Sequence, residues 1–225
     1  VFVGNNGAGK TNLLDAIHYL CLCKSYFNPI DSQQIKTEED IFLIQGDFDR
    51  KEKSEKISCG LKRNQKKQFK RNKKEYDKLA NHIGLFPVVM ISPYDVNLIM
   101  DGSEERRKFI DNVISQTDSK YLDELIVYNK QLLNRNALLK QVAATRKLDV
   151  ALLQILDEQL ILSGNKIFEK RKQFLVEFIP LFNKHYSYIT DNAEFVSLNY
   201  QSQLTDHSFE DLLNQSIEKD RALER

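Results

Sequence analysis

A glycine-rich run near the start of the chain has the residue types and spacing of a phosphate-binding loop. Gly4-Asn5-Asn6-Gly7-Ala8-Gly9-Lys10-Thr11 matches the Walker A pattern G-x-x-x-x-G-K-[ST]. Glycines let the backbone turn tightly, so that successive amide N–H groups point at phosphate oxygens. In loops of this pattern the lysine reaches the β- and γ-phosphates, and the threonine hydroxyl binds Mg²⁺. The run therefore predicts a site for a nucleoside triphosphate and its Mg²⁺.

The residues on both sides of the run are those that would position such a loop. Val1–Val3 is β-branched and aromatic, which is typical of the end of a buried strand. An amphipathic helix is expected directly after the loop, with its buried positions at Leu13, Leu14, Ile17, Tyr19, Leu20 and Leu22. The positive end of that helix dipole favours anion binding. The residues predicted to bind the nucleotide are Gly4, Asn5, Asn6, Gly7, Ala8, Gly9, Lys10, Thr11 and Asn12, and Thr11 is also the predicted Mg²⁺ ligand.

The motifs of a GTPase are missing from the sequence. None of the eight glycines has an aspartate three residues before it, and no Asn-Lys pair is followed by x-Asp. These absences argue against a GTPase.

A later stretch resembles the acidic Walker B motif of P-loop ATPases, but its spacing is helical. Leu152–Glu158 ends in two acidic residues, and Leu162–Asn165 is similar to the start of an ABC-type signature motif. The apolar residues here recur at spacings of 3, 4, 7, 7 and 4, at Leu153, Leu156, Leu160, Ile167, Phe174 and Phe178. We therefore predict a non-catalytic helix and no catalytic residue within these 225 residues.

The remaining patterns indicate an α/β chain with an inserted helical region. Period-two or short apolar runs predict strands at Ile41–Asp49, Ile57–Leu61, Gln68–Asn72, Val88–Ile91 and Val196–Gln201. The first three of these strands are expected to form a small antiparallel sheet. Helices are expected to start at Ser103, at Asp118 or Ser119 and at Ser208, and another to run from Leu148 to Phe178 with a break near Pro180.

Composition places the chain among soluble globular proteins. The 41% hydrophobic and 29% charged fractions are ordinary, and no apolar run approaches the roughly 18 residues that a membrane helix needs. The three cysteines are too few and odd in number for a disulfide framework, which fits a reducing compartment. We expect a cytoplasmic protein with no membrane partner.

The net charge of +1 hides a strongly basic segment. Residues 51–80 hold 12 basic and 4 acidic residues, whereas the other residues hold 21 basic and 28 acidic. Such a cluster can make sequence-independent, salt-sensitive contacts to DNA phosphates, or it can be a solvated hairpin whose lysines serve solubility. Both readings stay open at this stage. The candidate DNA contacts are Lys62, Arg63, Lys66, Lys67, Lys70 and Arg71.

Several motifs together resemble the RecF family of DNA replication and repair proteins, whose ATPase heads are similar to those of SMC and Rad50 proteins. The resemblance covers essentially the whole chain. It is carried by the loop Gly4–Leu14, by Ser92-Pro93-Tyr94-Asp95, by Gly102–Asp111, by the helical stretch Tyr128–Lys140 and by Asp157–Leu160. Phe27 departs from the pattern, because the family more often has arginine at that position.

The resemblance implies an ABC-type P-loop ATPase lobe with an inserted α-helical arm. Residues 1–102 would form part of the ATPase lobe with its small antiparallel sheet, residues 103–190 the helical arm, and residues 191–225 a return to the lobe. The chain starts without Met, so we expect a fragment, with the initial strands lying before Val1 and the signature and Walker B motifs lying beyond Arg225. A fragment of this kind would bind ATP weakly and would not hydrolyse it alone.

The resemblance also implies the partners of the whole protein. ATP would favour a homodimer clamped on single-stranded or gapped duplex DNA, where RecO and RecR help to load recombinase. Two other readings of the sequence are a P-loop kinase for a small molecule and a non-catalytic interaction fragment. A kinase fits less well, because a helical insertion follows the loop where a lid and substrate-binding arginines are expected.

Overall fold

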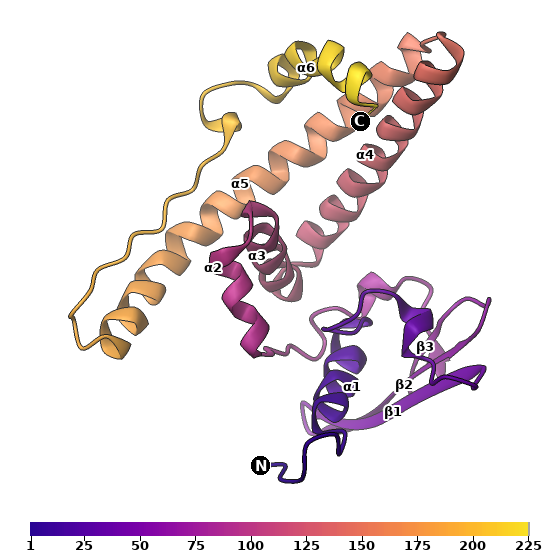
Figure 1. The fold of residues 1–225 in the computed structure, drawn as a ribbon, viewed down its shortest axis with the longest axis vertical. Helices are drawn as coiled ribbons and strands as arrows, with labels where there is room; N and C mark the ends of the chain where they lie inside the picture. The colour runs from indigo at the N-terminus through magenta and orange to yellow at the C-terminus, as the bar shows by residue number, and fades with distance from the viewer. Residues whose placement is uncertain (225) are drawn as a thin grey trace. The chain divides into compact units, whose positions relative to one another are not determined.

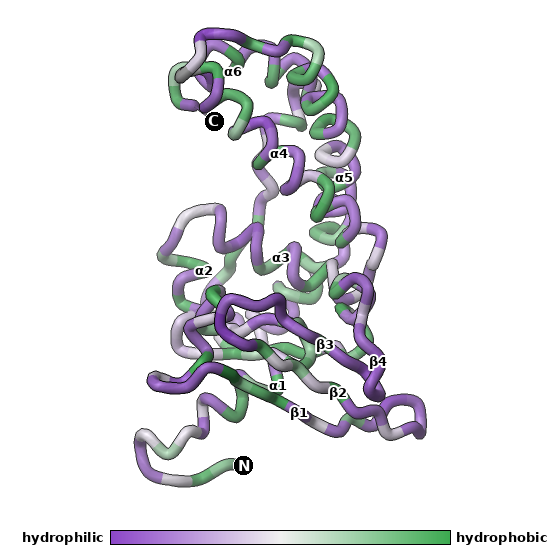
Figure 2. Tube along the Cα trace, turned by 90° about the vertical axis from the view of Figure 1, so that its right-hand side faces the viewer, coloured by the Kyte–Doolittle hydropathy of each residue, from purple (hydrophilic) through white to green (hydrophobic). Residues whose placement is uncertain are grey.

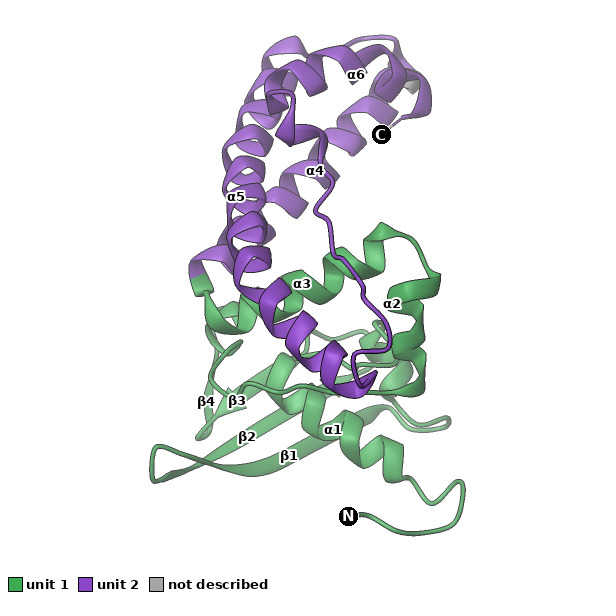
Figure 3. Cartoon of the chain, turned by 90° about the vertical axis from the view of Figure 1, so that its left-hand side faces the viewer, with its two compact units in different colours: residues 1–119 green, residues 120–225 purple. Residues whose placement is uncertain are grey.

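The structure is a computed structural model that describes residues 1–224, and the side chains of all these residues except 143 and 144. It divides after Ser119 into two compact units, unit 1 (residues 1–119) and unit 2 (residues 120–225) (Figure 3). Short 3₁₀ helices lie at Asp31–Gln34, Leu79–Asn81, Pro93–Val96 and Gln203–Thr205. The other elements in chain order (Figure 1) are α1 (Lys10–Leu22), β1 (Ile41–Arg50), β2 (Lys53–Lys62), β3 (Gln68–Arg71), β4 (Lys74–Glu75), α2 (Asn97–Met100), α3 (Ser103–Thr117), α4 (Ser119–Thr145), α5 (Val150–Ile189) and α6 (Phe209–Leu223).

Unit 1 is built on a four-stranded antiparallel sheet in the order β1-β2-β3-β4. Phe42 lies opposite Leu61, and Cys59 lies opposite Phe69, so apolar side chains from three strands share one face. The last turns of α1 pack on that face. The buried core consists of Tyr19, Leu20, Cys21, Leu22, Cys23, Ile57, Cys59, Phe69 and Phe86. The three strands predicted between residues 41 and 72 are therefore confirmed.

The helix α1 is buried along only half its length. Tyr19 and Leu20 are 1% and 3% exposed, whereas Leu13 and Leu14 are 44% and 46% exposed. The prediction that Leu13, Leu14 and Ile17 are buried is wrong, because the sheet covers only the C-terminal turns and no other element of residues 1–224 covers the first turns.

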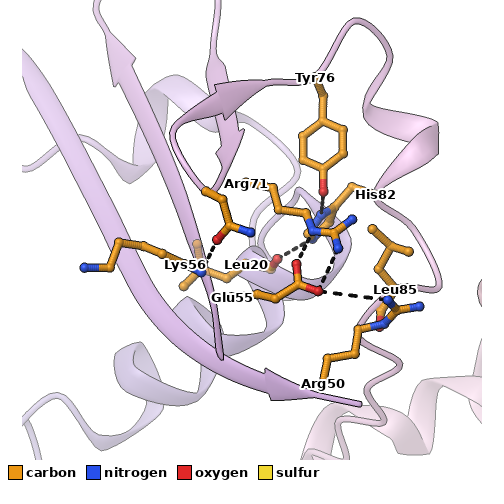
Figure 4. Close-up of polar contacts among 9 residues, drawn as sticks. Leu20, Arg50, Glu55, Lys56, Arg71, Tyr76, His82 and Leu85 are labelled. Carbon is orange, nitrogen blue, oxygen red and sulfur yellow. Dashed lines mark hydrogen bonds and ion pairs between the residues drawn. The ribbon is translucent and has the colours of Figure 1, made fainter. Parts of the chain in front are cut away.

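A buried ion pair closes one end of the sheet (Figure 4). The carboxylate of Glu55 on β2 is buried and accepts two hydrogen bonds from the guanidinium of Arg71 on β3, with 2.6 Å between Nη2 and Oε1. These hydrogen bonds lower the pKa of Glu55. The carboxylate therefore keeps its charge although it is buried.

His82 ties the segment after the sheet to α1 (Figure 4). Its side chain is fully buried, and its Nε2 lies 2.7 Å from the carbonyl oxygen of Leu20. Because a carbonyl only accepts, Nε2 carries the proton and Nδ1 accepts from the Tyr76 hydroxyl at 2.9 Å. Burial lowers the pKa of His82, so the neutral ring is the native form.

Unit 2 is an antiparallel pair, α4 and α5, with α6 packed on it. Leu138 of α4, Leu153 and Leu156 of α5 and Ile217 of α6 form an apolar cluster. Hydrophobic and hydrophilic residues alternate along α4 and α5, as amphipathic helices require (Figure 2). The predicted helix start at Ser208 is confirmed, because its hydroxyl accepts from the Asp211 amide.

Three predicted strands are not strands in the structure. Val1–Val3, Val88–Ile91 and Val196–Gln201 have no strand partner among residues 1–224, and Val89 and Ile91 are 84% and 85% exposed. A strand forms by pairing, so a β-prone segment without a neighbour stays extended but unpaired. The last segment follows α5, where the Tyr200 ring stacks on Phe168 with centroids 5.8 Å apart.

The predicted break at Pro180 is also wrong, because α5 continues through it to Ile189. Proline removes one donor and leaves the carbonyl of residue 176 without its helical partner. Val176 is 69% exposed, so water can reach this turn. A ladder of aromatic rings at four-residue spacing crosses the proline and supports the helix on both sides, through Phe174, Phe178, Phe182 and Tyr186.

The division between the compact units falls after Ser119, so α3 belongs to unit 1 rather than to the helical unit. The predicted domain boundaries at residues 102 and 190 therefore stay a prediction about the longer protein. No helix among the described residues is long and apolar enough to cross a membrane.

The burial of His82 predicts a pH-dependent stability. The unfolded histidine takes up a proton below pH about 6.5, whereas the folded one resists protonation, so the unfolding free energy falls as the pH drops below that value. In urea unfolding between pH 7 and 5.5, His82→Gln should give a shallower slope, by at most about 1.4 kcal/mol per pH unit.

His207, which is exposed, provides the control. His207→Gln should keep the wild-type unfolding free energy at pH 7, as expected of a substitution at an exposed position. Some slope should also remain in His82→Gln, because burial lowers the pKa of His18 as well. An unchanged slope in His82→Gln would contradict the assignment.

Candidate nucleotide-binding site

The glycine-rich run forms an open loop that ends at the first residue of α1. Gly7 and Gly9 have φ values of 83° and 89°, a region that residues with a side chain rarely adopt. The Ala8 amide donates to the Asn5 carbonyl at 3.2 Å and closes the turn. Gly9 is the N-cap of α1 and brings no capping side chain, so the first amides of the helix are free to bind an anion.

The lysine of the motif lies across this loop. Its ammonium Nζ donates to the carbonyl oxygens of Gly4 at 2.6 Å and of Asn5 at 2.8 Å. Thr11 and Asn12 are exposed in the first turn of α1. The nine residues that were predicted to bind the nucleotide therefore lie together. The Lys10 ammonium and the free backbone amides at the start of α1 are part of this group.

A polar network connects the loop helix to the Ser92–Asp95 stretch. Asp15, one turn after Thr11, accepts from the Ser25 hydroxyl at 2.6 Å and from the Tyr26 amide at 2.7 Å. The Tyr26 hydroxyl in turn donates to the carboxylate of Asp95. Asp15 is a residue that sequence reasoning missed. The sequence does place Asp15 four residues after Thr11, and residues at this spacing are neighbours on one face of a helix.

Phe27 takes part in an aromatic cluster beside this network. Its ring lies edge-on to Tyr26 at 5.1 Å and to Tyr94 at 6.2 Å between centroids. The position where the resemblance implies arginine therefore makes ring contacts through Phe27.

The basic segment divides into cations that have partners within the chain and cations that have no ion pair among residues 1–224. Arg63 donates to the Glu39 carbonyl at 2.9 Å, Lys67 pairs with Asp31 at 2.7 Å, and Arg71 pairs with Glu55. The other three candidates have no ion pair within the described part of the chain, and they are Lys62, Lys66 and Lys70. For the residues in strands, the strand register explains why Arg71 is paired and Lys62 and Lys70 are not. Residues on the core face meet buried partners, whereas Lys62 and Lys70 alternate to the outer face.

The buried thiols near the end of α1 carry no ionic chemistry at neutral pH. Burial raises the pKa of Cys21 and of Cys59 to about 11, and that of Cys23 to about 12. All three are free cysteines. A thiolate is the nucleophilic and metal-binding form, so these groups act as small apolar side chains.

The acidic stretch that resembles Walker B is helical, as predicted. Asp157 lies within α5 and accepts from Nε of Arg135 at 2.7 Å, while Nη1 of the same arginine donates to Asp220 of α6 at 2.8 Å. Arg135 is 2% exposed. The Asp157 carboxylate thus balances a buried cation that joins α4, α5 and α6.

A family model described as an AAA domain matches residues 1–224. The chain belongs to this AAA domain family. This one family match therefore covers both the loop before α1 and the helical unit.

Curated relatives share about half of the sequence. The chain is 51% identical to the DNA replication and repair protein RecF of Parabacteroides distasonis and 53% identical to that of Flavobacterium johnsoniae, each over 222 residues and 99% of this chain. It spans about 60% of the length of these relatives, 60% and 62% respectively. The resemblance to the RecF family is confirmed.

Solved structures of RecF have the same fold. The chain superposes with a TM-score of 0.84 at 30% identity on the structure described as the recombination mediator protein RecF-ATPrS in the RecFOR pathway, over 98% of this chain and 62% of that one. The structure described as RecF-ATP gives the same TM-score and identity, over 97% and 61%. The predicted α/β P-loop ATPase fold with a helical arm is confirmed.

The role assigned to Asp157 can be tested against its neighbour in the sequence. Asp157→Asn leaves Arg135 with one carboxylate partner in a buried site, so the unfolding free energy should fall by about 3 kcal/mol. Nucleotide affinity should not change. Glu158→Gln, which alters an exposed carboxylate, is the matched control and should leave both quantities as in the wild type. Wild-type stability in Asp157→Asn would show that the ion pair is not structural.

Proposed function

We propose that the chain is the nucleotide-binding part of an ATP-dependent DNA-binding protein of DNA replication and recombinational repair. The observation that carries the proposal is the open loop Gly4–Thr11, with positive φ at Gly7 and Gly9, in a chain that is about half identical to RecF proteins over nearly its whole length. The ATP named for a RecF structure of the same fold supports ATP as the nucleotide.

The residues of the loop fit a triphosphate. The amides of the turn and of the first turn of α1 would hold phosphate oxygens, and Lys10, already placed against the Gly4 and Asn5 carbonyls, would supply the cation. The exposed Thr11 hydroxyl is the group that would hold Mg²⁺. When bound, Mg²⁺ neutralises charge on the β- and γ-phosphates. Asn12 follows in the same exposed turn.

The DNA contact is proposed for Lys62, Lys66 and Lys70 rather than for the whole basic segment. These three ammonium groups are unpaired among residues 1–224, whereas Arg63, Lys67 and Arg71 are held by partners within the chain. Cations that face solvent can release the counterions of a phosphate backbone, which gives sequence-independent and salt-sensitive binding.

For the longer protein we propose an ATP-dependent homodimer that binds single-stranded or gapped DNA in the cytoplasm and works with RecO and RecR to help load recombinase. The pathway name attached to the RecF structures supports the link to RecO and RecR. Residues 103–190 would serve as its helical arm, and residues 191–225 would lead back to the ATPase lobe.

The nucleotide site can be tested on the chain of 225 residues. ATP with Mg²⁺ should bind, and Lys10→Ala should weaken binding at least about tenfold, because a charge-assisted hydrogen bond contributes about 1.5–3 kcal/mol. Fluorescent nucleotide titration measures the affinity. The exposed Lys36 gives a control, Lys36→Ala, with unchanged affinity. Wild-type nucleotide affinity in Lys10→Ala would contradict the assignment of Lys10 to the phosphates.

The DNA contact predicts a change in salt dependence. Lys62→Ala combined with Lys66→Ala should weaken binding of the longer protein to duplex DNA and lower the slope of log affinity against log salt by about 2, since each phosphate contact contributes about 1. The control is Lys51→Ala with Lys53→Ala, which removes the same charge from the β1–β2 turn and the first residue of β2. Equal slopes for the two double variants would place the contacts elsewhere.

A further inference from the structure

Tyr94 presents an aromatic ring to solvent from a turn whose backbone is fixed. The residue is 67% exposed. It lies in the 3₁₀ turn Pro93–Val96, where Ser92 Oγ accepts from the Tyr94 amide at 3.2 Å and the Asp95 carboxylate accepts from the Ser92 amide at 2.7 Å. Proline at the first position of the turn restricts the backbone further. The ring is therefore exposed at a fixed place.

Phe27 lies against this ring and is also exposed. Phe27 is 39% exposed, and its ring is edge-on to that of Tyr94, with centroids 6.2 Å apart and 72° between the ring planes. The Phe27 amide donates to Ser25 Oγ at 3.2 Å, which fixes the backbone of this residue as well. In an edge-on pair the edge of one ring meets one face of the other, so the pair leaves ring faces uncovered. We call Tyr94 and Phe27 the aromatic pair.

The β2–β3 connection of the basic segment is fastened to the segment that carries Phe27. Nζ of Lys67 donates to the Cys23 carbonyl and to Asp31 Oδ2, both at 2.7 Å. Phe27 is four positions from Cys23 and from Asp31, so at most about 14 Å of chain joins it to either contact. The exposed Lys66 directly precedes Lys67. The aromatic pair and Lys66 can therefore bind one short strand of DNA.

A further cation precedes Phe27 in the same segment. Lys24 has no ion pair among residues 1–224, and its Nζ donates to the amide oxygen of Asn112 at 3.3 Å. The acidic side chain of residues 24–31 is that of Asp31, which is paired with Lys67. This segment therefore carries an unpaired positive charge three residues from the ring of Phe27, and that charge complements a DNA phosphate.

Aromatic rings beside cations are the combination that binds single-stranded nucleic acid, because bases stack on the rings while the cations follow the phosphates. A base inside a duplex is already stacked on its neighbours and has to be extruded first, at a cost in free energy. An unpaired base has a face open for stacking. Phe69 of the basic segment is only 1% exposed, so the exposed rings come from two other segments of unit 1.

We propose that the aromatic pair is a stacking platform for an unpaired base of a DNA strand whose phosphates are bound by Lys24 and Lys66. In gapped DNA the unpaired strand supplies this base. The inference deepens the proposed function and rests on it, because it names the unpaired strand as the DNA that this surface binds.

The test compares two strands that differ only in their bases. The longer protein, with saturating ATP and Mg²⁺, is titrated with a deoxythymidine strand of about 15 nucleotides and with an abasic strand of the same length. Tyr94→Leu should weaken binding of the deoxythymidine strand about fivefold or more, the factor that one stacked base contributes. Its affinity for the abasic strand should not change, nor should the slope of log affinity against log salt, because no phosphate contact is removed.

Three variants serve as controls. Tyr94→Phe keeps the ring and should keep the wild-type affinity for both strands. Tyr188→Leu changes a tyrosine of α5 that is 86% exposed, and it should also leave both affinities unchanged. Lys66→Ala should weaken binding of both strands by the same factor, since it removes a phosphate contact and no ring.

The outcomes separate this inference from the function on which it rests. A wild type that binds both strands equally well, or a Tyr94→Leu variant with wild-type affinity for the deoxythymidine strand, would overturn the platform alone. Equal weakening of both strands by Tyr94→Leu would show a merely structural role and would also overturn it. A Tyr94→Leu variant that loses ATP affinity but keeps DNA affinity would assign the rings to adenine instead. A wild type that binds no DNA would overturn the proposed function, and the platform with it.

Photocross-linking tests the platform without any substitution. A strand that carries 5-iododeoxyuridine is irradiated on the wild-type longer protein, and the cross-linked peptides are identified by mass spectrometry. Cross-links should form at Tyr94 or Phe27, because the iodinated base reacts with an aromatic ring on which it stacks. Cross-links confined to other residues would contradict the proposal.

Discussion

The burial of only one half of α1 is the constraint on which the rest of unit 1 depends. A helix that binds an anion with its first amides must leave them exposed. The contacts that hold such a helix in place therefore have to lie at its C-terminal end. Tyr19 and Leu20 supply the apolar burial at that end. The carbonyl of Leu20 accepts from His82 and that of Cys23 accepts from Lys67, so the polar groups there are also satisfied. The loop can stay open because the helix behind it is held.

The middle of α1 has a separate attachment, which connects the loop to the residues before the helical region. Asp15 holds the backbone at Tyr26, and the Tyr26 hydroxyl holds Asp95. Asp95 also accepts from the Ser92 amide at 2.7 Å in a capping box that fixes the 3₁₀ turn Pro93–Val96. These are hydrogen bonds to carboxylates, which are about twice as strong as neutral ones. These bonds hold the Ser92–Asp95 stretch, which is remote in sequence, near the turn of α1 that follows Thr11.

Local patterns predicted the parts of the fold that local physics determines. The helix after the glycine-rich loop, the antiparallel strands and the helical phase around Asp157 each follow from residues close in sequence, and these three predictions are confirmed. The errors concern segments whose state depends on distant neighbours. Val88–Ile91 has the composition of a strand but no strand partner among residues 1–224, and Leu13 has the spacing of a buried residue but nothing packed over it. Pro180 does not end the helix, because α5 continues through it and the rings of Phe178 and Phe182 are in contact on either side of it.

The basic segment shows why a count of charges could not define the candidate DNA contact. Arg71 and Lys70 are neighbours in sequence, yet strand alternation sends one to the buried Glu55 and the other to the outer face. A shift of one residue in register would exchange them. The register of β3 is in turn fixed by Phe69, which is 1% exposed and lies opposite Cys59. The burial of Phe69 therefore decides which cations of β3 remain available for phosphate. The sequence alone does not show which cations these are, because the register depends on pairing with β2.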